Sequence, residues 1–247
     1  MDNHFFDSKD QEPLEREIQK NKIQEGSKDL NIENLLYDKE IICPVCSKTF
    51  SYRVVKSHAP KVKSKDSDSF IRYKDIVPYF YEIIVCPNCG YSAFRNEFEK
   101  IKSNQREIIY EKVGTHWRHK EFPKIYDESI AIERYKLALL SAVIGDFKIS
   151  TKSILSLKIA WMYRLLERKK EEEEYLKKAI QGLTSAYESE STPIYGLNIN
   201  EMQFLIGELN RRIGNFNEAN QWFGRVITES DDYRLKEKTR NMRDLMK

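Results

Sequence analysis

Apolar residues in the second half of the chain recur every three or four positions, which is the spacing of helices that bury one side. The runs start after Tyr126 and are separated by short polar breaks. The first predicted helix extends from Ser129 to Ile144 and ends near Gly145. Four further helices are predicted from apolar positions over residues 154–166, 175–187, 202–213 and 219–227. The charged stretch 231–247 keeps enough apolar positions for a final capping helix.

The first half of the chain carries strand signals instead. Thr49–Val55 alternates and is rich in β-branched residues, so we predict a strand there. The apolar run Tyr79–Val85 is predicted to be a second strand, and the lysine-rich segment 56–69 a polar loop. Farther on, six apolar residues keep roughly helical spacing and predict a helix that Gly114 ends. These residues are Phe94, Phe98, Ile101, Ile108, Ile109 and Val113.

The N-terminal residues carry little structural signal. Residues 1–28 lack a sustained apolar stripe, and we expect a poorly ordered tail there. The segment Asp29–Tyr37 is predicted to form a short helix that docks onto the following module through Leu30, Leu35 and Leu36. Residues 1–37 are therefore treated as a flexible or partly helical N-terminal tail.

All four cysteines fall in two C-x2-C motifs, Cys43-Pro44-Val45-Cys46 and Cys86-Pro87-Asn88-Cys89. Two such turns can present four thiolates as a tetrahedron, which is the donor set of a closed structural Zn²⁺ site. Proline after the first cysteine of each pair fixes φ, and Gly90 permits the positive φ that closes the second turn. We predict that Cys43, Cys46, Cys86 and Cys89 bind a metal ion. Zinc is expected, and iron held by the same four thiolates is the alternative.

Other roles for paired cysteines fit this chain less well. A thioredoxin-like C-x-x-C motif needs a βαβ context, which the pattern does not predict. A catalytic zinc needs an open coordination position, and four cysteines leave none.

His116 and His119 form an H-x2-H motif beside Trp117, but no carboxylate pair lies near it in sequence, so we expect surface or packing histidines. His58, in the lysine-rich loop, is expected to be exposed.

These elements predict an α+β protein that is mostly α. A strand that leads into a C-P-x-C-G turn is the layout of a zinc ribbon, so residues 38–125 are predicted to be a small zinc-ribbon-like β module with a following helix. The apolar core of such a small module is thin, and the metal is expected to supply much of its folding free energy. Residues 126–247 are predicted to be a tetratricopeptide-like helical array.

The helical array shows weak internal repetition. With Gly207 set at position 8 of the tetratricopeptide pattern, Ala219 and Phe223 supply its A-x3-F element. With Ala160 at position 8 of an earlier unit, Tyr163 falls at position 11. Such arrays bind peptides along a concave groove lined by the first helix of each unit. The candidate partner-binding residues on those helices are Tyr163, Arg164, Gln203, Asn210 and Arg211.

Charge is segregated along the chain, although the whole carries only +3. Residues 39–126 hold 17 basic and 10 acidic residues, a net of +7, so the metal module is the basic part. A basic face is expected from the segment 56–74 and its neighbour Arg53, and zinc ribbons can bind nucleic acids through phosphate contacts and base stacking. Its basic residues are Arg53, Lys56, Lys61, Lys63, Lys65, Arg72 and Lys74, and the aromatic residues that could interleave with them are Tyr52, Phe70, Tyr73, Tyr79 and Tyr81. The alternative is a solvated loop over a strand core whose aromatic side chains point inward.

Several function classes lack support in this sequence. No P-loop, dinucleotide-binding, zinc-protease or serine-hydrolase motif is present. No apolar run is long enough to span a membrane, and residues 1–10 lack the features of a secretion signal. Paired thiols in a metal-binding arrangement fit a reducing compartment, so a cytoplasmic location is expected.

The chain resembles an uncharacterised bacterial family that joins an N-terminal zinc-ribbon-like module to C-terminal tetratricopeptide-like helices. The resemblance covers roughly residues 38–230. It is carried by the four cysteines and by Gly90, Tyr91, Ala160, Trp161, Tyr163 and Arg164. The resemblance implies the architecture and no activity. We therefore expect a non-enzymatic interaction or scaffold protein with a structural zinc site and a helical groove for a peptide or protein partner. The alternative is a nucleic-acid-associated regulator that binds nucleic acid through the basic zinc-ribbon module.

Overall fold

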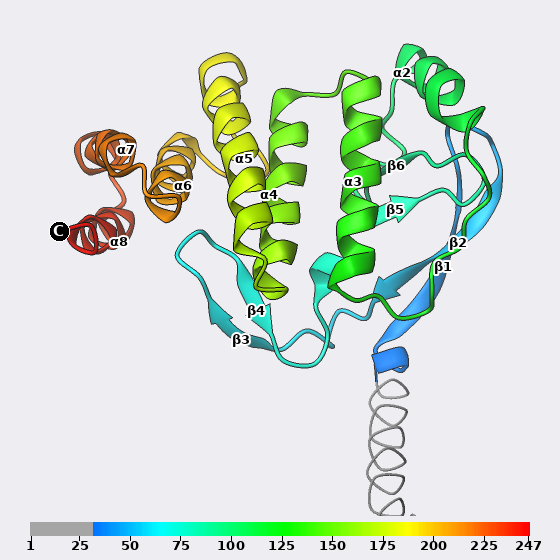
Figure 1. Ribbon diagram of the computed structural model, residues 1–247, viewed down its shortest axis with the longest axis horizontal. Helices are drawn as coiled ribbons and strands as arrows, with labels where there is room; N and C mark the ends of the chain where they lie inside the picture. The colour runs from blue at the N-terminus through cyan, green and yellow to red at the C-terminus, as the bar shows by residue number, and fades with distance from the viewer. Residues whose placement is uncertain (1–31) are drawn as a thin grey trace, which may run out of the picture.

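A computed structural model describes residues 32–247, so the poorly ordered stretch predicted over residues 1–28 and the docking residue Leu30 lie outside that range. The described residues form a mixed α+β structure that is mostly helical, with short antiparallel hairpins first and helices after them (Figure 1). Of the helix predicted over Asp29–Tyr37, Ile32 and Glu33 are helical, but the prediction is wrong from Leu36 onward, where strand β1, Leu36–Ile42, begins. The backbone there pairs with a neighbouring strand, Leu36 opposite Val55, which satisfies its hydrogen bonds without a helix.

Two hairpins carry the cysteine pairs in their turns. Strand β1 pairs with β2, Thr49–Val55, and the first cysteine pair lies between them. Strand β5, Ile83–Val85, pairs with β6, Ser92–Phe94, around the second pair. A third hairpin consists of β3, Val62–Lys65, and β4, Ile71–Tyr73. Within residues 32–247 each hairpin is its own two-stranded sheet, so no strand hydrogen bonds join the two cysteine hairpins.

Two predicted elements near the second cysteine pair need correction. The strand predicted over Tyr79–Val85 is a 3-10 turn, η1 (Pro78–Tyr81), followed by the short strand β5. Proline starts the turn, and the three aromatic residues after it are all buried, so they do not alternate as strand residues would. The helix predicted from Phe94 begins only at Ser103, because Phe94 ends β6 and the next residues form turns. The apolar spacing there reflects buried turn residues.

The remaining helices confirm the predicted pattern. Helix α2, Ser103–Ile109, continues into one π-helical turn, η2 (Tyr110–Gly114), so Gly114 ends the element as predicted. The six helices that follow are α3 (Glu128–Ile144), α4 (Ile149–Leu165), α5 (Lys169–Ser189), α6 (Ile199–Arg212), α7 (Phe216–Glu229) and α8 (Tyr233–Asp244). No described helix is long and apolar enough to cross a bilayer.

Side chains fix several of these helix starts. Asp127 accepts a hydrogen bond from the backbone N–H of Ile130 at the start of α3. Asn198 and Glu201 form a reciprocal capping box at the start of α6. Asp232 accepts from two backbone N–H groups of α8. These caps satisfy backbone donors that would otherwise be unpaired, so they set where each helix begins.

One hydrophobic core runs through both halves of the described chain. It joins residues of the hairpin segments, such as Phe70 and Ile83, to residues of α3, α4, α5 and α6. Helix α3 contacts η1, β5 and β6 on one side and α4 on the other, which places it at the junction in Figure 1. A second cluster surrounds the cysteines, and a third lies between α6, α7 and α8. The division at residue 126 therefore stays a sequence prediction, and the packing is continuous across it.

Candidate metal centre and polar network

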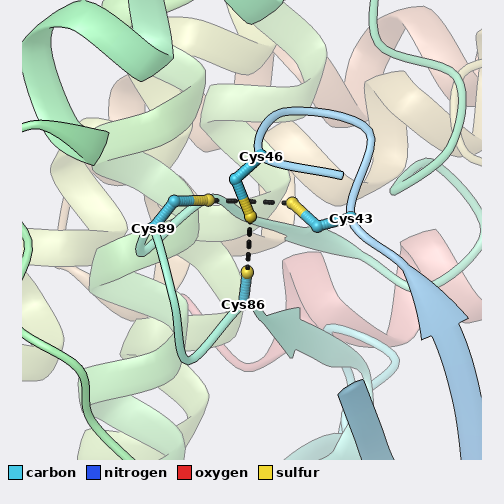
Figure 2. Close-up of side chains that lie close together, drawn as sticks. All are labelled: Cys43, Cys46, Cys86 and Cys89. Atoms are coloured by element: carbon cyan, nitrogen blue, oxygen red, sulfur yellow. Dashed lines mark hydrogen bonds between the residues drawn. The ribbon is translucent and has the colours of Figure 1, made fainter. Parts of the chain in front are cut away.

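The four cysteine sulfurs converge at one point (Figure 2). The Sγ atoms of Cys43 and Cys89 are 3.7 Å apart, those of Cys46 and Cys86 are 3.6 Å apart, and all four lie within 4.8 Å of one another. A zinc ion with Zn–S bonds of about 2.3 Å at the centre of a tetrahedron has S···S edges of about 3.8 Å. The sulfur positions therefore fit a tetrahedral metal ion, and the geometry does not distinguish zinc from iron.

The two cysteine turns have the same backbone geometry. In the first, the N–H of Ser47 donates to the carbonyl of Cys43, and in the second the N–H of Gly90 donates to Cys86, both at 2.9 Å. Both donors have positive φ, 57° at Ser47 and 73° at Gly90. The predicted role of Gly90 in closing its turn is confirmed.

Trp117 covers the second turn. Its indole Nε1 donates to the carbonyl of Pro87 at 2.9 Å. A Cβ atom added at Gly90 would overlap the Trp117 ring. Glycine is therefore required there both for its φ and for the tryptophan that packs against it.

Burial and charge favour a cation among the thiols. Cys43, Cys86 and Cys89 are buried among apolar side chains, and Cys46 is half-buried. The contact with Cys86, together with burial, raises the pKa of the Cys43 thiol, and the contacts with Cys43 and Cys86, together with burial, raise the pKa of the Cys89 thiol. Four thiolates can be this close only if a positive ion lies between them. With four sulfur ligands the coordination shell is complete, which is the arrangement of a structural site.

The histidines take no part in this cluster. Within residues 32–247 the four cysteines are the one group of three or more His, Cys, Asp or Glu side chains whose ligand atoms converge in this way. His116 and His119 are exposed; His116 contacts Thr115, and His119 lies 3.4 Å from Glu121. His58 is exposed as well. The expectation of surface histidines is confirmed for all three.

Three of the five candidate partner-binding residues lie inside the helical packing. The Tyr163 hydroxyl accepts a hydrogen bond from Lys136 Nζ at 2.8 Å. Gln203 is fully buried and donates to the hydroxyl of Tyr187 and the carboxylate of Glu229. Asn210 is buried and donates back to a carbonyl of its own helix. The side chains of Arg164 and Arg211 are 9% and 19% exposed, and both bind carboxylates of the chain itself.

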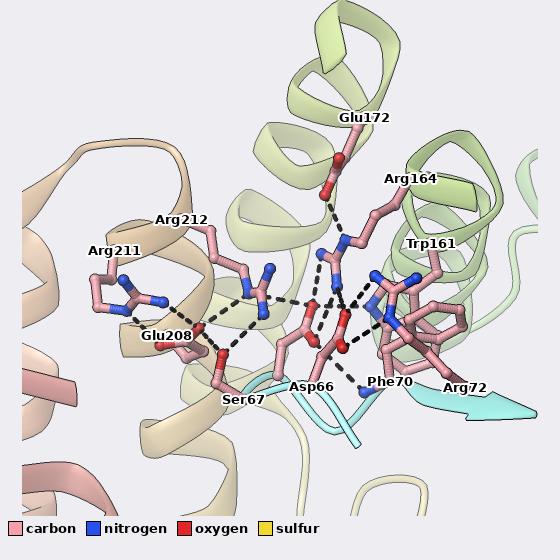
Figure 3. A network of polar contacts seen from close by, with 11 residues as sticks. Asp66, Ser67, Phe70, Arg72, Trp161, Arg164, Glu172, Glu208, Arg211 and Arg212 are labelled. Atoms are coloured by element: carbon pink, nitrogen blue, oxygen red, sulfur yellow. Dashed lines mark hydrogen bonds and ion pairs between the residues drawn. The ribbon is translucent and has the colours of Figure 1, made fainter. Parts of the chain in front are cut away.

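Arg164 holds the tip of the β3–β4 hairpin (Figure 3). Its guanidinium lies 2.8 Å from Asp68 and 3.0 Å from Asp66. The indole of Trp161 on the same helix donates to Asp68 at 3.0 Å, and Glu172 of α5 accepts from Arg164 Nε at 2.6 Å. Asp68 is fully buried, and burial tends to raise its pKa. The Arg164 guanidinium outweighs that effect and holds the pKa below the ordinary value.

Helix α6 binds the other side of the same hairpin tip. Glu208 is fully buried and accepts from Arg211 at 2.7 Å and from Arg212 at 2.9 Å. Ser67 donates to Glu208 and accepts from Arg212 at 2.8 Å. Residues 66–68 therefore connect α4 to α6, although Asp66 lies 98 positions from Arg164 and Ser67 lies 141 positions from Glu208. We call these residues and their helix partners the hairpin network.

Sequence reasoning did not find the hairpin network. The segment 56–69 is predicted to be a polar loop, and its end instead forms β3 and a buried acidic tip. The one local signal is that Asp66-Ser67-Asp68 interrupts a lysine-rich segment. The aromatic residues assigned to a stacking surface are mostly buried, with Phe70, Tyr79 and Tyr81 in the core. Lys61, Lys63 and Lys65 are exposed.

Comparison with known proteins gives a family and no activity. An uncharacterised protein from Borreliella burgdorferi (strain ATCC 35210) is 29% identical over a stretch that covers 42% of this chain and 42% of that protein. The match thus spans less than half the length of that relative. No solved structure matches the chain. A family model described as "Uncharacterized protein conserved in bacteria (DUF2225)" matches residues 36–246, which include both cysteine turns and α2 to α8. The chain therefore belongs to this bacterial family.

Proposed function

We propose that this protein is a non-enzymatic interaction protein, in which a structural Zn²⁺ bound by Cys43, Cys46, Cys86 and Cys89 holds a zinc-ribbon-like module beside tetratricopeptide-like helices. The convergence of four largely buried sulfurs at tetrahedral spacing carries the metal part of this proposal. A complete sulfur shell leaves no coordination position for substrate, which supports a structural role over a catalytic one.

The ion would join two hairpins that share no strand pairing. Strands β1 and β2 form one sheet, and β5 and β6 another. Each contributes one C-x2-C turn, so the four sulfur bonds would replace the hydrogen bonds that a continuous sheet would supply. This is the arrangement that gives a zinc ribbon its stability. Because the cluster also packs on α2 and η2, loss of the ion would loosen those elements as well.

Close contacts between α6 and α7 support the repeat interpretation. A Cβ atom at Gly207 of α6 would lie 2.8 Å from the ring of Phe223 of α7, and Ala219 of α7 is fully buried. Small residues at these positions let the two helices approach, as in a tetratricopeptide unit. The earlier unit would consist of α4 and α5, where Ala160 and Ala179 are fully buried.

The hairpin network supports a specific class of partner. The first helices of the two units, α4 and α6, bind an acidic segment, the hairpin tip, through Arg164 and Arg212, and Arg211 pairs with Glu208 on the same face of α6. That segment belongs to the chain itself. The same face has the charge to bind a protein segment rich in carboxylates, either beside the hairpin tip or in competition with it. An acidic extended segment of another protein is therefore the proposed partner.

Two measurements on the full chain test this proposal. Elemental analysis of purified protein is expected to show about one zinc per chain, and protein without zinc or iron would refute the metal role. Wild-type protein is expected to bind a synthetic peptide with two spaced aspartates, and the Arg211→Ala variant is expected to bind it more weakly. A variant with Lys61, Lys63 and Lys65 all replaced by alanine is expected to bind the peptide like wild type. If the lysine variant instead loses binding to single-stranded RNA while peptide binding is absent throughout, the nucleic-acid alternative replaces this proposal.

A further inference from the structure

A second candidate site lies on the other side of α3 from the helical array. A cavity of about 530 Å³ is lined mainly by β2, by the second cysteine turn and by the connector before α3, with one residue each from β1, β5 and α3. Its volume is within the range of small-molecule sites. The residue from α3 is Arg134, which is only 3% exposed.

Arg134 is a buried cation without a carboxylate partner within residues 32–247. One of its terminal nitrogens donates to the carbonyl of Ile83, and its Nε has no hydrogen-bond partner. The guanidinium lies against two aromatic rings, 4.3 Å from the centroid of Tyr126 and 4.9 Å from that of Phe122. The rings stabilise the charge in part, but they do not satisfy an N–H donor.

The other cations that line the cavity differ from Arg134, because each has an acidic neighbour. Arg53 contacts Asp38 at 3.2 Å, Lys120 contacts Glu133, and Lys124 contacts Glu33 at 3.3 Å. Burying a charge without a counter-ion is costly, and proteins do so mainly where a ligand supplies the opposite charge. Arg134 is therefore the cation at this cavity that lacks a counter-ion, and a bound anion would supply one.

Charge and shape limit what that anion is. The lining holds four basic side chains, Arg53, Lys120, Lys124 and Arg134. The first three are paired with carboxylates, so Arg134 carries the positive charge that has no counter-ion. A phosphate group presents several acceptor oxygens to a guanidinium fork, which makes it a suitable anion for this position. The rings of Phe50, Phe122 and Tyr126 also line the cavity and offer apolar surface to the rest of the molecule.

We propose that this cavity binds a small phosphate monoester, with the phosphate group at Arg134 and the organic part against the aromatic rings. Phe122 lies over the guanidinium in a stretch with no helix or strand, so its ring can shift to admit the phosphate oxygens. The site borders Pro87 and Asn88, which lie between the cysteines of the second turn. The proposed ligand site and the second cysteine turn are thus adjacent in the fold.

The test uses the zinc-loaded full chain and three probes: adenosine monophosphate, adenosine and inorganic phosphate. Calorimetry is expected to show binding of adenosine monophosphate, weaker binding of phosphate, and none of adenosine. Arg134→Gln is expected to weaken nucleotide binding about tenfold or more. The matched control is Arg118→Gln, an exposed arginine of the same connector outside the cavity lining, which is expected to bind like wild type.

Other outcomes overturn the proposal. It fails if wild-type protein binds none of the probes, if adenosine binds as well as its monophosphate, or if Arg134→Gln binds like wild type. Because a change at a buried residue can impair folding, Lys120→Gln provides a second variant on a half-exposed side chain of the same lining. The Lys120→Gln variant is expected to bind adenosine monophosphate a fewfold more weakly than wild type and to keep the same thermal midpoint. If Arg134→Gln is unfolded and Lys120→Gln binds like wild type, the proposed site is also refuted.

Discussion

Replacing Asp68 by alanine tests whether the hairpin tip is anchored between α4 and α6. Asp68 is fully buried and accepts hydrogen bonds from Arg164 at 2.8 Å and from Trp161 at 3.0 Å. The variant removes the carboxylate and leaves a guanidinium that is 9% exposed and an indole N–H without this acceptor. Removing one member of a buried ion pair costs about 3–5 kcal/mol of unfolding free energy.

The remaining partners place the expected loss at the low end of that range. Arg164 keeps Asp66 and Glu172 as ion-pair partners in the variant, so its charge is not left uncompensated. We expect a loss of about 3 kcal/mol. For a chain of this size, 1 kcal/mol shifts the thermal midpoint by about 2–4 °C, so Asp68→Ala should lower it by about 6–12 °C.

The matched control is an exposed ion pair at the base of the same hairpin. Asp75 lies 3.5 Å from Lys61, and both side chains are at least half exposed. Asp75→Ala should change the unfolding free energy by about 0.5 kcal/mol or less, because water screens exposed pairs. Thermal unfolding followed by circular dichroism, with zinc in excess, compares the two variants. Equal midpoints for Asp68→Ala and Asp75→Ala would refute the buried anchor.

Three further predictions concern the metal, the helix contact and acid. Cys86→Ser should lose the bound metal and unfold at lower temperature; retention of full metal content by elemental analysis would contradict the site. Gly207→Ala should cost about 1–3 kcal/mol in urea unfolding, because the new Cβ meets Phe223, whereas Gly224→Ala, with open space around it, should be neutral or slightly stabilising. The pKa of Asp68 is lowered in the folded state, so its contribution is complete above the unfolded value of about 3.9 and is lost as pH falls through the lower folded value. The difference in unfolding free energy between wild type and Asp68→Asn should be constant from about pH 5 to 8 and shrink below about pH 4; a difference that changes between pH 5 and 8 would refute this account.

The sequence predicts those features that depend on neighbours along the chain. Helices α3 to α8 follow from apolar spacing and are confirmed, because residues three and four apart meet on one helix face whatever the fold. The convergence of the cysteines follows from two short motifs. The turns around Phe94 and Phe98 were misread as helix, since buried turn residues can share the helical spacing.

The hairpin network and Arg134 lie beyond such local reasoning. Asp68 and Arg164 are 96 residues apart, and no periodic pattern connects them. A charged residue in a polar loop is normally solvated, so sequence alone favours exposure for Asp66 and Asp68. Likewise, Arg134 occupies one position of a helix otherwise rich in apolar residues, where an arginine is expected to extend to solvent. Its burial depends on the cysteine hairpin that packs on α3.

The β segments are thus fixed to the helices by two anchors of different chemistry. The cysteine cluster holds β1–β2 and β5–β6 against α2 and α3, and the hairpin network holds β3–β4 against α4 and α6. The first anchor would depend on thiolates and the proposed ion, whereas the second depends on buried carboxylate–guanidinium pairs, so removal of the metal and exposure to acid should act on different elements. Local unfolding follows such units. Metal removal should therefore increase hydrogen exchange in the cysteine hairpins first, while α6 to α8 and the β3–β4 tip keep their protection. Equal loss of protection in both parts would mean that the continuous core couples the anchors more strongly than their separate chemistry implies.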